Sequence, residues 1–459
     1  MSDFSIVDFG AINDGVTLNT AAIGAAIDAA SKESGRVIIP AGGIFLTGSI
    51  VLKGDIEFHI EEGAVLKASG DYADYLPEHL IPAITNGAVV ESVLPQRSFI
   101  SAYQAHGLTI TGKGTIDGNA DAFIAERGRY IHSMRAPEGG RSQYLERPFT
   151  LFLIDCQAIE IKDVTIKDPA FWALRLTGCD DSSITGISIL TDLMVPNADG
   201  IDIDRCENVQ ITHCRLITAD DCISLKSCAA TSQYGAVKNI FISKCFMTST
   251  SGAITLGTES VGAIENVIVT DCVVKDSHRG FAVRAREGGL ISNVIFEDCI
   301  VETRAFSDSW WGHGEALHVT ASSWDDPKVE WNPELGNIER QYEGRVDGVK
   351  FSNIKVVSEA ALLIWGSRPE LVKNIQFNRI SLTMKHVSKW PARIDLRPNP
   401  IKDFIRQPAA ALTFINAQEV SVADSEITWD LETRSNYRCA MDIENIDGLY
   451  LHNLTYEQP

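Results

Sequence analysis

A short strand motif that recurs along the chain constrains the fold more than any other feature of the sequence. The motif reads apolar, any, apolar, any, any, then cysteine or an apolar residue, and four copies end at Cys214, Cys245, Cys272 and Cys299. The second apolar residue of each copy stands at positions 161, 184, 211, 242, 269, 296, 351, 377, 422 and 451. Most intervals are 23 to 31 residues, and those of 55 and 45 are close to two periods. A repeat of this length indicates a solenoid.

The spacing inside each repeat indicates strands. Apolar residues alternate with a period of two, and no long helical stretch separates one copy from the next,. Strands that follow one another in one direction are expected to wind into a parallel β-helix, with successive turns about 4.8 Å apart. We therefore predict an all-β, single-domain parallel β-helix over residues 1–459. A multi-domain α/β fold would need helices between the strands.

The first 35 or so residues are expected to form a cap over the first turn of the solenoid. Asn19 or Thr20 can cap a helix through Lys32,. Its apolar face consists of Ile23, Ala26, Ile27 and Ala30,. Strands are predicted at 36–39, 50–52, 56–60 and 64–67. Segments 118–150 and 302–346 interrupt the repeat, and such insertions often form the binding face of a solenoid. Segment 386–409 is expected to be a proline-containing loop.

Composition and charge limit the partners. The net charge of −21 argues against nucleic acid or an anionic membrane surface, and also against a polyanionic substrate unless basic residues line the site,. The sequence contains no run of 18 apolar residues, so we predict no membrane-spanning helix,. No signal peptide is visible at the start,. The ten cysteines follow the repeat, which predicts a ladder of buried, reduced thiols,. We expect a cytoplasmic protein, or a secreted one if a leader has been removed. The sequence does not indicate an oligomeric state.

Three carboxylates lie in two segments about one repeat apart. N-A-D-G-I-D-I-D holds Asp199, and D-D-C-I-S-L-K-S begins with Asp220 and Asp221. Each segment leads into an alternating strand, so the acids are expected at one edge of a sheet. Adjacent strand residues point to opposite faces, so Asp220 and Asp221 can share a face only if a turn or bulge precedes the strand. Paired carboxylates suit glycosidic hydrolysis, with one protonating the leaving oxygen and another activating water. Alternatively, the pair is a solvated turn, as expected for Asp180–Asp181.

Several motifs together resemble polygalacturonase-like glycoside hydrolases (family 28). They are D-F-G-A-I-N-D-G near the start, I-I-P-A-G-G-I-F-L-T-G-S-I, E-E-G-A-V-L, G-K-G-T-I-D-G, P-A-F-W-A-L, N-A-D-G and D-D-C-I-S-L-K-S. The resemblance covers roughly residues 7–300. It implies a right-handed parallel β-helix and inverting hydrolysis of a pectic polysaccharide, without a metal or other cofactor. It also implies that Asp220 is the general acid and that Asp199 and Asp221 hold or activate water. Inverting enzymes hold their carboxyl groups roughly 6.5–9.5 Å apart.

Two departures from the family pattern bear on the substrate. The family usually has His-Gly where this chain has Ser251-Gly252, and Arg-x-Lys, which grips a uronate carboxylate, where it has Ala282-Val283-Arg284. Arg284 can still pair with a carboxylate, with help from Arg286 or Arg279. A rhamnogalacturonan-type chain therefore becomes an alternative to polygalacturonate. His278 is a candidate to supply the missing imidazole, or else a histidine of a turn.

The motif W-W-G-H-G-E at 310–315 could stack on sugar rings and bind hydroxyls, or could be a loop anchored by buried tryptophans. Lys226, beside Asp204, is either a substrate clamp or part of an ion pair. Trp172 is expected in the core. The predicted substrate-binding residues are Lys226, Ser251, His278, Arg284, Arg286, Trp310, Trp311, His313 and Glu315.

Three functions remain open at this point. The favoured one is an inverting glycoside hydrolase acting on pectic poly- or oligosaccharides. A polysaccharide lyase of the same fold would need a calcium-binding acid cluster and a base. A catalytically silent carbohydrate-binding β-helix would explain the residues at 251 and 282. A carbohydrate is the expected partner in all three.

Overall fold

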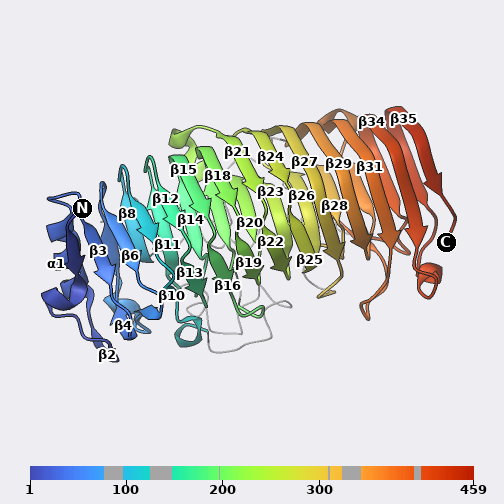
Figure 1. Cartoon of the computed structure of the whole chain (residues 1–459). Helices are drawn as coiled ribbons and strands as arrows, with labels where there is room; N and C mark the ends of the chain where they lie inside the picture. The colour runs from blue at the N-terminus through green and yellow to red at the C-terminus, as the bar shows by residue number, and fades with distance from the viewer. Residues whose placement is uncertain (77–96, 125–146, 196, 309–310, 323–342, 397–404) are drawn as a thin grey trace, which may run out of the picture. The chain divides into compact units, whose positions relative to one another are not determined.

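The computed structural model describes residues 1–76, 97–124, 147–195, 197–308, 311–322, 343–396 and 405–459. Within these residues the chain is built almost entirely from parallel strands, and α1 (Thr20–Ala30) is the single α-helix (Figure 1). No helix among them is long and apolar enough to cross a membrane. The chain divides into two compact units. The first holds the described residues up to Asp220 together with Gln233–Gly235, and the second holds Asp221–Ser232 and the described residues from Ala236 onward. The predicted single domain stays a prediction.

In the first unit, equivalent strands of successive turns pair in parallel. One such row consists of β3 (Arg36–Ile39), β6 (Glu57–Ile60), β9 (Thr109–Thr111), β12 (Glu160–Lys162), β15 (Asp180–Thr185) and β18 (Glu207–Thr212). Its buried residues lie opposite one another in the order Val37, Phe58, Ile110, Ile161, Ile184 and Ile211. The alternation read from the sequence therefore sets the register, because each apolar residue points inward and stacks on the one before it.

The remaining strands of the first unit complete its turns. They are β1 (Asp3–Ser5), β2 (Asp14–Leu18), β4 (Gly43–Thr47), β5 (Ile50–Leu52), β7 (Ala64–Ala68), β8 (Ser98–Tyr103), β10 (Thr115–Asp117), β11 (Phe149–Ile154), β13 (Thr165–Lys167), β14 (Leu174–Thr177), β16 (Ser188–Leu190), β17 (Ile201–Asp204) and β19 (Arg215–Thr218). The four strands predicted before residue 70 are present to within a residue, whereas β1, β2 and β4 were not predicted.

The second unit continues the same architecture. Its main row is β21 (Val237–Ser243), β24 (Ile264–Thr270), β27 (Leu290–Thr303), β29 (Arg345–Ser358), β31 (Val372–Met384), β34 (Leu412–Trp429) and β35 (Met441–Tyr456). The other strands are β20 (Ile223–Ser227), β22 (Phe246–Ser249), β23 (Gly252–Ser260), β25 (Val273–Ser277), β26 (Arg279–Ala285), β28 (Leu317–Ala321) and β30 (Leu362–Gly366), with a short antiparallel pair, β32 (Ile394–Asp395) and β33 (Ile405–Arg406).

The two long intervals of the repeat are single turns, which corrects the prediction that each holds two periods. Phe296 lies directly opposite Phe351, and Phe377 lies directly opposite Val422. The additional residues therefore leave the coil between β27 and β29 and between β31 and β34, without adding a turn to this row. An interval in the sequence gives only the length of chain between two strands, and an insertion lengthens it as much as another turn would.

The interior of the second unit contains a column of stacked aromatic rings. Neighbouring rings lie 4.7 to 5.5 Å apart between centroids and within 14° of parallel. The column consists of Phe281, Phe296, Phe351, Phe377 and Phe414. All ten cysteines are free, and nine are buried, as the ladder predicted. A continuous apolar interior of this kind fixes the register of the strands that carry the polar residues.

The N-terminal helix is present, with two differences from the prediction. Its face of Ile23, Ala26, Ile27 and Ala30 is buried as expected, and α1 lies beside β3 at the blue end of Figure 1. The helix ends at Ala30, two residues before Lys32. The side chain of Asn19 does not cap it, because that amide binds the backbone of Ile12, Thr17 and Leu46 instead.

Candidate active site

The segment that carries Asp199 is held in place from outside its own turn. Asn197 adopts a left-handed conformation (φ 48°), and its side-chain oxygen accepts a hydrogen bond from Arg147 Nη2 at 3.1 Å. Arg147 Nη1 also donates to the carbonyl of Ala170 at 3.1 Å. Arg147 belongs to the insertion predicted at 118–150, although its role was not predicted. In the sequence, only its position in that insertion indicated that Arg147 could lie near the site.

Asp220 and Asp221 lie between two strands, after β19 ends at Thr218 and before β20 begins at Ile223. The hydroxyl of Thr218 donates to the carbonyl of Asp220 at 2.6 Å, which closes the turn. Because the pair stands outside regular strand geometry, its successive side chains are not forced to opposite faces. The turn that the prediction required is therefore present.

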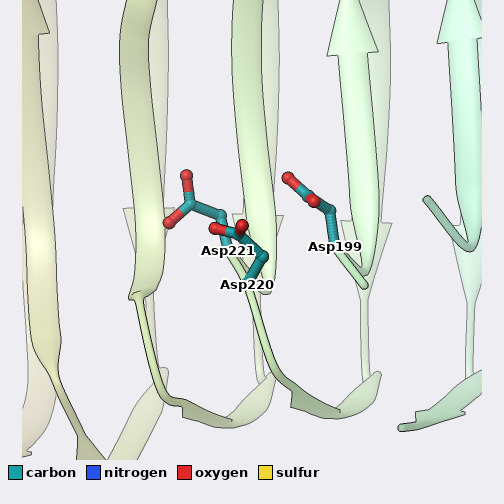
Figure 2. Close-up of side chains that lie close together, drawn as sticks. All are labelled: Asp199, Asp220 and Asp221. Atoms are coloured by element: carbon teal, nitrogen blue, oxygen red, sulfur yellow. The ribbon is translucent and has the colours of Figure 1, made fainter. Parts of the chain in front are cut away.

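Asp199, Asp220 and Asp221 form one acid cluster. Each offers a carboxylate oxygen, and these oxygens all lie within 4.8 Å of one another (Figure 2). All three side chains are largely buried, at 3–8% exposure. The juxtaposition predicted from the two motifs is present in the structure. The roles assigned to the individual acids stay predictions.

The spacing within the acid cluster is shorter than expected. The nearest oxygens lie closer than the roughly 6.5–9.5 Å between carboxyl groups that is typical of inverting glycosidases,. The spacing by itself therefore does not indicate inversion. Ionised carboxylates this close repel one another, so the cluster favours a shared proton or a nearby cation. Three carboxylate oxygens could also hold a hard divalent cation, and the predicted absence of a metal stays a prediction.

Asp221 has a distinct set of neighbours. The Ser251 hydroxyl donates to Asp221 Oδ1 at 3.2 Å, and Arg279 Nη2 lies 3.8 Å from the same oxygen. Gly252 leaves room for this carboxylate, because a Cβ there would lie 2.6 Å from Asp221 Oδ1. Ser251, predicted to bind substrate, is thus a direct partner of the acid cluster.

Three arginines of β26 and the residue after it form a buried arginine cluster, Arg279, Arg284 and Arg286. Burial, followed by repulsion from Arg279, lowers the pKa of Arg284 well below its usual value and that of Arg286 to about 9. Arg286 donates to the Thr320 hydroxyl at 2.7 Å. This concentration of positive charge opposes the net charge of −21 and provides the local basic surroundings that an anionic substrate requires,.

His318 was not predicted as part of the site. It lies opposite Ala282 in the neighbouring strand, and its Nε2 is 3.1 Å from the Thr320 hydroxyl. Burial, then the charges of Arg284, Arg279 and Arg286, lower the pKa of His318 well below its usual value. This imidazole is therefore neutral at ordinary pH. Nothing in the local sequence around it marks it as a neighbour of the arginines.

Lys226 and Asp204 have separate ion-pair partners. Lys226 Nζ lies 3.6 Å from Glu259 Oε2, and both side chains are nearly buried. Asp204 accepts a hydrogen bond from Arg175 at 3.0 Å inside the first unit. The ion-pair alternative for Lys226 is therefore present with Glu259, and the role of a substrate clamp stays a prediction.

His278, His313 and Glu315 are all buried, His278 between β25 and β26 and the other two in the W-W-G-H-G-E motif. His278 Nε2 donates to the carbonyl of Gly312 at 2.8 Å, and its Nδ1 accepts from the backbone N–H of Phe306. These contacts fit the turn histidine rather than a replacement imidazole for the acid cluster.

Glu315 and His313 are likewise engaged with backbone. The two oxygens of Glu315 accept backbone N–H groups of His313 and Asp395, and His313 Nε2 donates to the carbonyl of Pro391. These contacts indicate a structural role for both and do not support the predicted contact with sugar. Of the two tryptophans, Trp311 is half-buried, and Trp310 lies outside the described residues.

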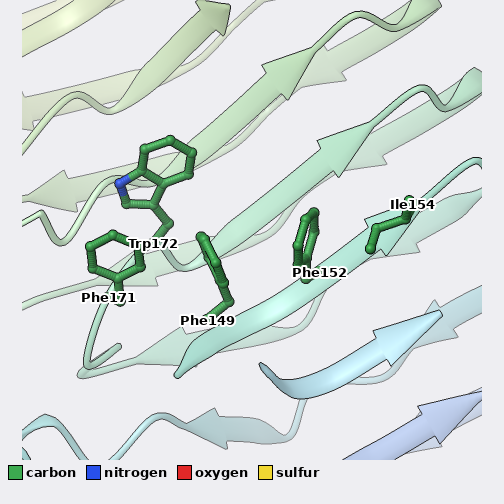
Figure 3. Packing of buried hydrophobic residues seen from close by; sticks show 5 residues of the cluster. All are labelled: Phe149, Phe152, Ile154, Phe171 and Trp172. Atoms are coloured by element: carbon green, nitrogen blue, oxygen red, sulfur yellow. The ribbon is translucent and has the colours of Figure 1, made fainter. Parts of the chain in front are cut away.

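An aromatic cluster in the first unit confirms the prediction that Trp172 is a core residue. Phe171 and Trp172 stack at 5.6 Å, and Phe149 packs edge-on against both (Figure 3). Phe149 stands two residues after Arg147 in the sequence. The guanidinium of Arg147 lies 4.8 Å from the Phe171 ring of the same cluster. Rigid aromatic packing thus supports β11 and the start of β14, which pairs with β17, the strand that follows Asp199.

Comparison with known proteins identifies the class of the fold and then the family. The model for glycosyl hydrolases family 28 matches residues 34–305, more than half of the chain. A solved structure of a family 28 exopolygalacturonase from Yersinia enterocolitica superposes with a TM-score of 0.67 at 18% identity, covering 99% of this chain and 78% of that one. The fold is thus a parallel β-helix of the pectinase type. The chain belongs to family 28 of the glycosyl hydrolases.

Two curated relatives describe the similarity further. A probable polygalacturonase of Vitis vinifera is 31% identical over 265 residues, covering 56% of this chain and 51% of the relative. An exo-poly-alpha-D-galacturonosidase of Dickeya chrysanthemi is 26% identical over 294 residues, covering 56% and 47%. The chain therefore spans about half the length of the curated relatives that it matches.

Proposed function

We propose that the protein hydrolyses glycosidic bonds in pectic polysaccharides or oligosaccharides. The observation that carries the proposal is the acid cluster of Asp199, Asp220 and Asp221, in a chain that belongs to this hydrolase family. Asp220 protonates the leaving oxygen, and Asp199 and Asp221 orient and deprotonate the attacking water. Inversion at the anomeric carbon is the outcome that family membership favours, and no metal takes part.

The arginine cluster supports galacturonate as the sugar recognised. Each galacturonate unit carries a carboxylate, and a buried guanidinium can bind such a group through two parallel hydrogen bonds. The relatives named above are described as polygalacturonases or exo-acting galacturonosidases, which favours the same substrate class. A rhamnogalacturonan-type chain is the alternative within the same class of polysaccharide.

Packing at the C-terminal side supports attack on chain ends or short oligomers. Ile394 and Leu396 pack on Leu363, Trp365 and Ile415, which belong to β30 and β34. These strands are therefore covered by the segment around β32, so a long polysaccharide cannot lie across them.

Reducing-end release from polygalacturonate and from defined oligogalacturonides tests the proposal. The wild-type protein is expected to produce new reducing ends, and Asp220→Asn to lower kcat by about 10³-fold, within the range for loss of a general acid. Asp181→Asn is the matched control. It alters the second acid of another Asp-Asp pair that is exposed to solvent. Absence of new reducing ends across a panel that includes rhamnogalacturonan would refute the hydrolase.

The same assay separates the two alternatives. A lyase would form unsaturated products that absorb in the ultraviolet and would lose activity with a chelator, because its cation would occupy the acid cluster,. A silent binder would retain oligosaccharide without producing either signal. We expect hydrolysis that is unchanged by the chelator.

A further inference from the structure

We propose that Arg279, acting through Ser251, is the positioning residue for the carboxylate of Asp221. The inference rests on the proposed function, since it assigns a role in the step that activates water. It also replaces the suggestion that His278 supplies a missing imidazole. Arg279 was considered from the sequence only as an assistant to Arg284 in gripping a uronate.

The proposal starts from a chain of contacts that ends on one oxygen. Arg279 Nη2 donates to the Ser251 hydroxyl at 3.0 Å, and that hydroxyl donates to Asp221 Oδ1 at 3.2 Å. The guanidinium nitrogen lies 3.8 Å from the same oxygen, within ion-pair distance. One oxygen of Asp221 is thus fixed by a hydroxyl and a cation. Restraint of this kind sets the direction in which the other oxygen faces a bound water.

The backbone and the aliphatic part of Arg279 are held in place on two sides. The backbone N–H of Arg279 donates to the Ser251 carbonyl at 2.8 Å, which fixes the start of β26 against β23. On the other side Gly312 lies against the side chain, and a Cβ there would stand 2.6 Å from Arg279 Cδ. His278 donates to the carbonyl of Gly312, so the loop is tied to the residue preceding Arg279. Gly312, within the W-W-G-H-G-E motif, thus supports this arginine.

Arg279 is not a saturated structural cation. It is 2% exposed, and within the described part of the chain its Nε and Nη1 atoms have no hydrogen-bond partner. Its directed contacts are therefore concentrated on Ser251 and Asp221. A guanidinium used only to stabilise the fold would normally have all its donors satisfied, because buried unpaired donors are destabilising.

Several charged groups share these surroundings and bear on the pH dependence. Asp199 and Asp220 lie beside Asp221. Arg284 lies on β26 together with Arg279, Arg286 follows β26 directly, and His318 lies on the neighbouring strand β28. Asp395 comes from the segment that covers β30. Arg279 Nη2 forms an ion pair with Asp221 Oδ1 at 3.8 Å.

The test compares Arg279→Met, Arg279→Lys and Ser251→Ala with wild type by steady-state kinetics across pH. We expect Arg279→Met to lower kcat about 100-fold with KM changed less than threefold, and to move the acidic limb of the kcat/KM profile to higher pH. Arg279→Lys should restore part of kcat, and Ser251→Ala should give a smaller loss in the same direction. Lys275→Met is the control, since it removes an exposed cation from β25, four residues earlier, that pairs with Glu302.

Two results would overturn the proposal. One is an Arg279→Met protein that unfolds like wild type but keeps its kcat and its pH profile. The other is a loss confined to KM, which would make Arg279 a substrate-binding residue only. If wild type releases no reducing ends, the proposed function fails, and ¹³C carboxyl NMR still tests the contact. The aspartate resonance missing from Asp221→Asn should move in Arg279→Met at a fixed pH, and an unchanged resonance would contradict the inference.

Discussion

Two buried arginines of this molecule, Arg175 and Arg279, carry the same charge in equally closed surroundings but have different partners. Arg175 donates to Asp204 at 3.0 Å and to the Thr177 hydroxyl at 3.0 Å, and its guanidinium lies within about 5.5 Å of the rings of Phe149, Phe152 and Trp172. Arg279 reaches one hydroxyl and one carboxylate, with two nitrogens lacking a hydrogen-bond partner in the described residues.

The partners, and not burial, distinguish the structural cation Arg175 from Arg279, which we propose positions Asp221. Arg175 and Asp204 neutralise each other with neither side chain exposed, so the pair has no free charge to offer a ligand. Arg279 instead shares a single carboxylate oxygen with a hydroxyl and stands among other arginines. Burial and sequence context alone would have classed the two together.

The largest effect is expected from removing the structural arginine. Arg175→Met removes the buried ion pair with Asp204, so the free energy of unfolding should fall by about 3–5 kcal/mol,. The matched control is Arg36→Met, which breaks the exposed pair with Asp3 at 2.8 Å and should change stability by less than about 1 kcal/mol,. Urea unfolding measures both. A double variant, Arg175→Met with Asp204→Leu, should recover much of the loss, and failure to do so would show that the aromatic contacts, rather than the ion pair, dominate at this site.

The contrast between these arginines also marks what the sequence could predict. The alternation of apolar residues predicted the register where the repeat is regular, with Ile184 on Ile211 and Val269 on Phe296, because the side-chain period of a strand is a local property,. The acid cluster was predictable for the same reason, since Asp199 and Asp221 each stand two residues before the start of a strand, at Ile201 and at Ile223. The Ser251–Arg279 contact was not, because it depends on side-chain directions at the turn and on a loop from a later insertion. Arg147 was missed for the same kind of reason.

The loop that supports Arg279 is expected to show two opposing pH dependences. Burial raises the pKa of Glu315 to about 7 from 4.5, and burial lowers the pKa of His313 to about 4 from 6.5. Glu315 therefore contributes stability below pH 4.5 that is lost as pH rises to 7. His313 contributes stability above pH 6.5 that is lost as pH falls to 4. Each group changes the free energy of unfolding by about 3 kcal/mol across its pH range, so in the wild-type protein the two contributions largely offset each other.

Single variants should separate these opposing terms. With Glu315→Gln, the free energy of unfolding should rise between pH 4 and 6.5, relative to wild type, because only the His313 term remains. With His313→Gln it should fall between pH 4.5 and 7. Urea unfolding at several pH values measures both slopes, and comparison of slopes removes any constant loss from replacing a carboxylate oxygen that accepts a backbone N–H. Parallel pH profiles for all three proteins would contradict the assignment.

The smallest change distinguishes the support of Arg279 from general loop stability. Gly312 and Gly314 both have positive φ, at 94° and 98°, so alanine at either should destabilise the protein by about 1–2 kcal/mol through backbone strain,. Only at position 312 would the added Cβ meet Arg279, at 2.6 Å from Cδ, whereas at 314 it would meet Glu359 Cβ at 2.9 Å. Gly312→Ala should therefore lower kcat about tenfold at a temperature where both variants are folded, and Gly314→Ala should leave it within about twofold. Equal kcat values for the two variants would show that the loop supports the fold and does not position the arginine. A loss of kcat at position 312 alone would instead show that the contacts that distinguish Arg279 from Arg175 affect the rate of the reaction, because the methyl group displaces the guanidinium without changing its charge.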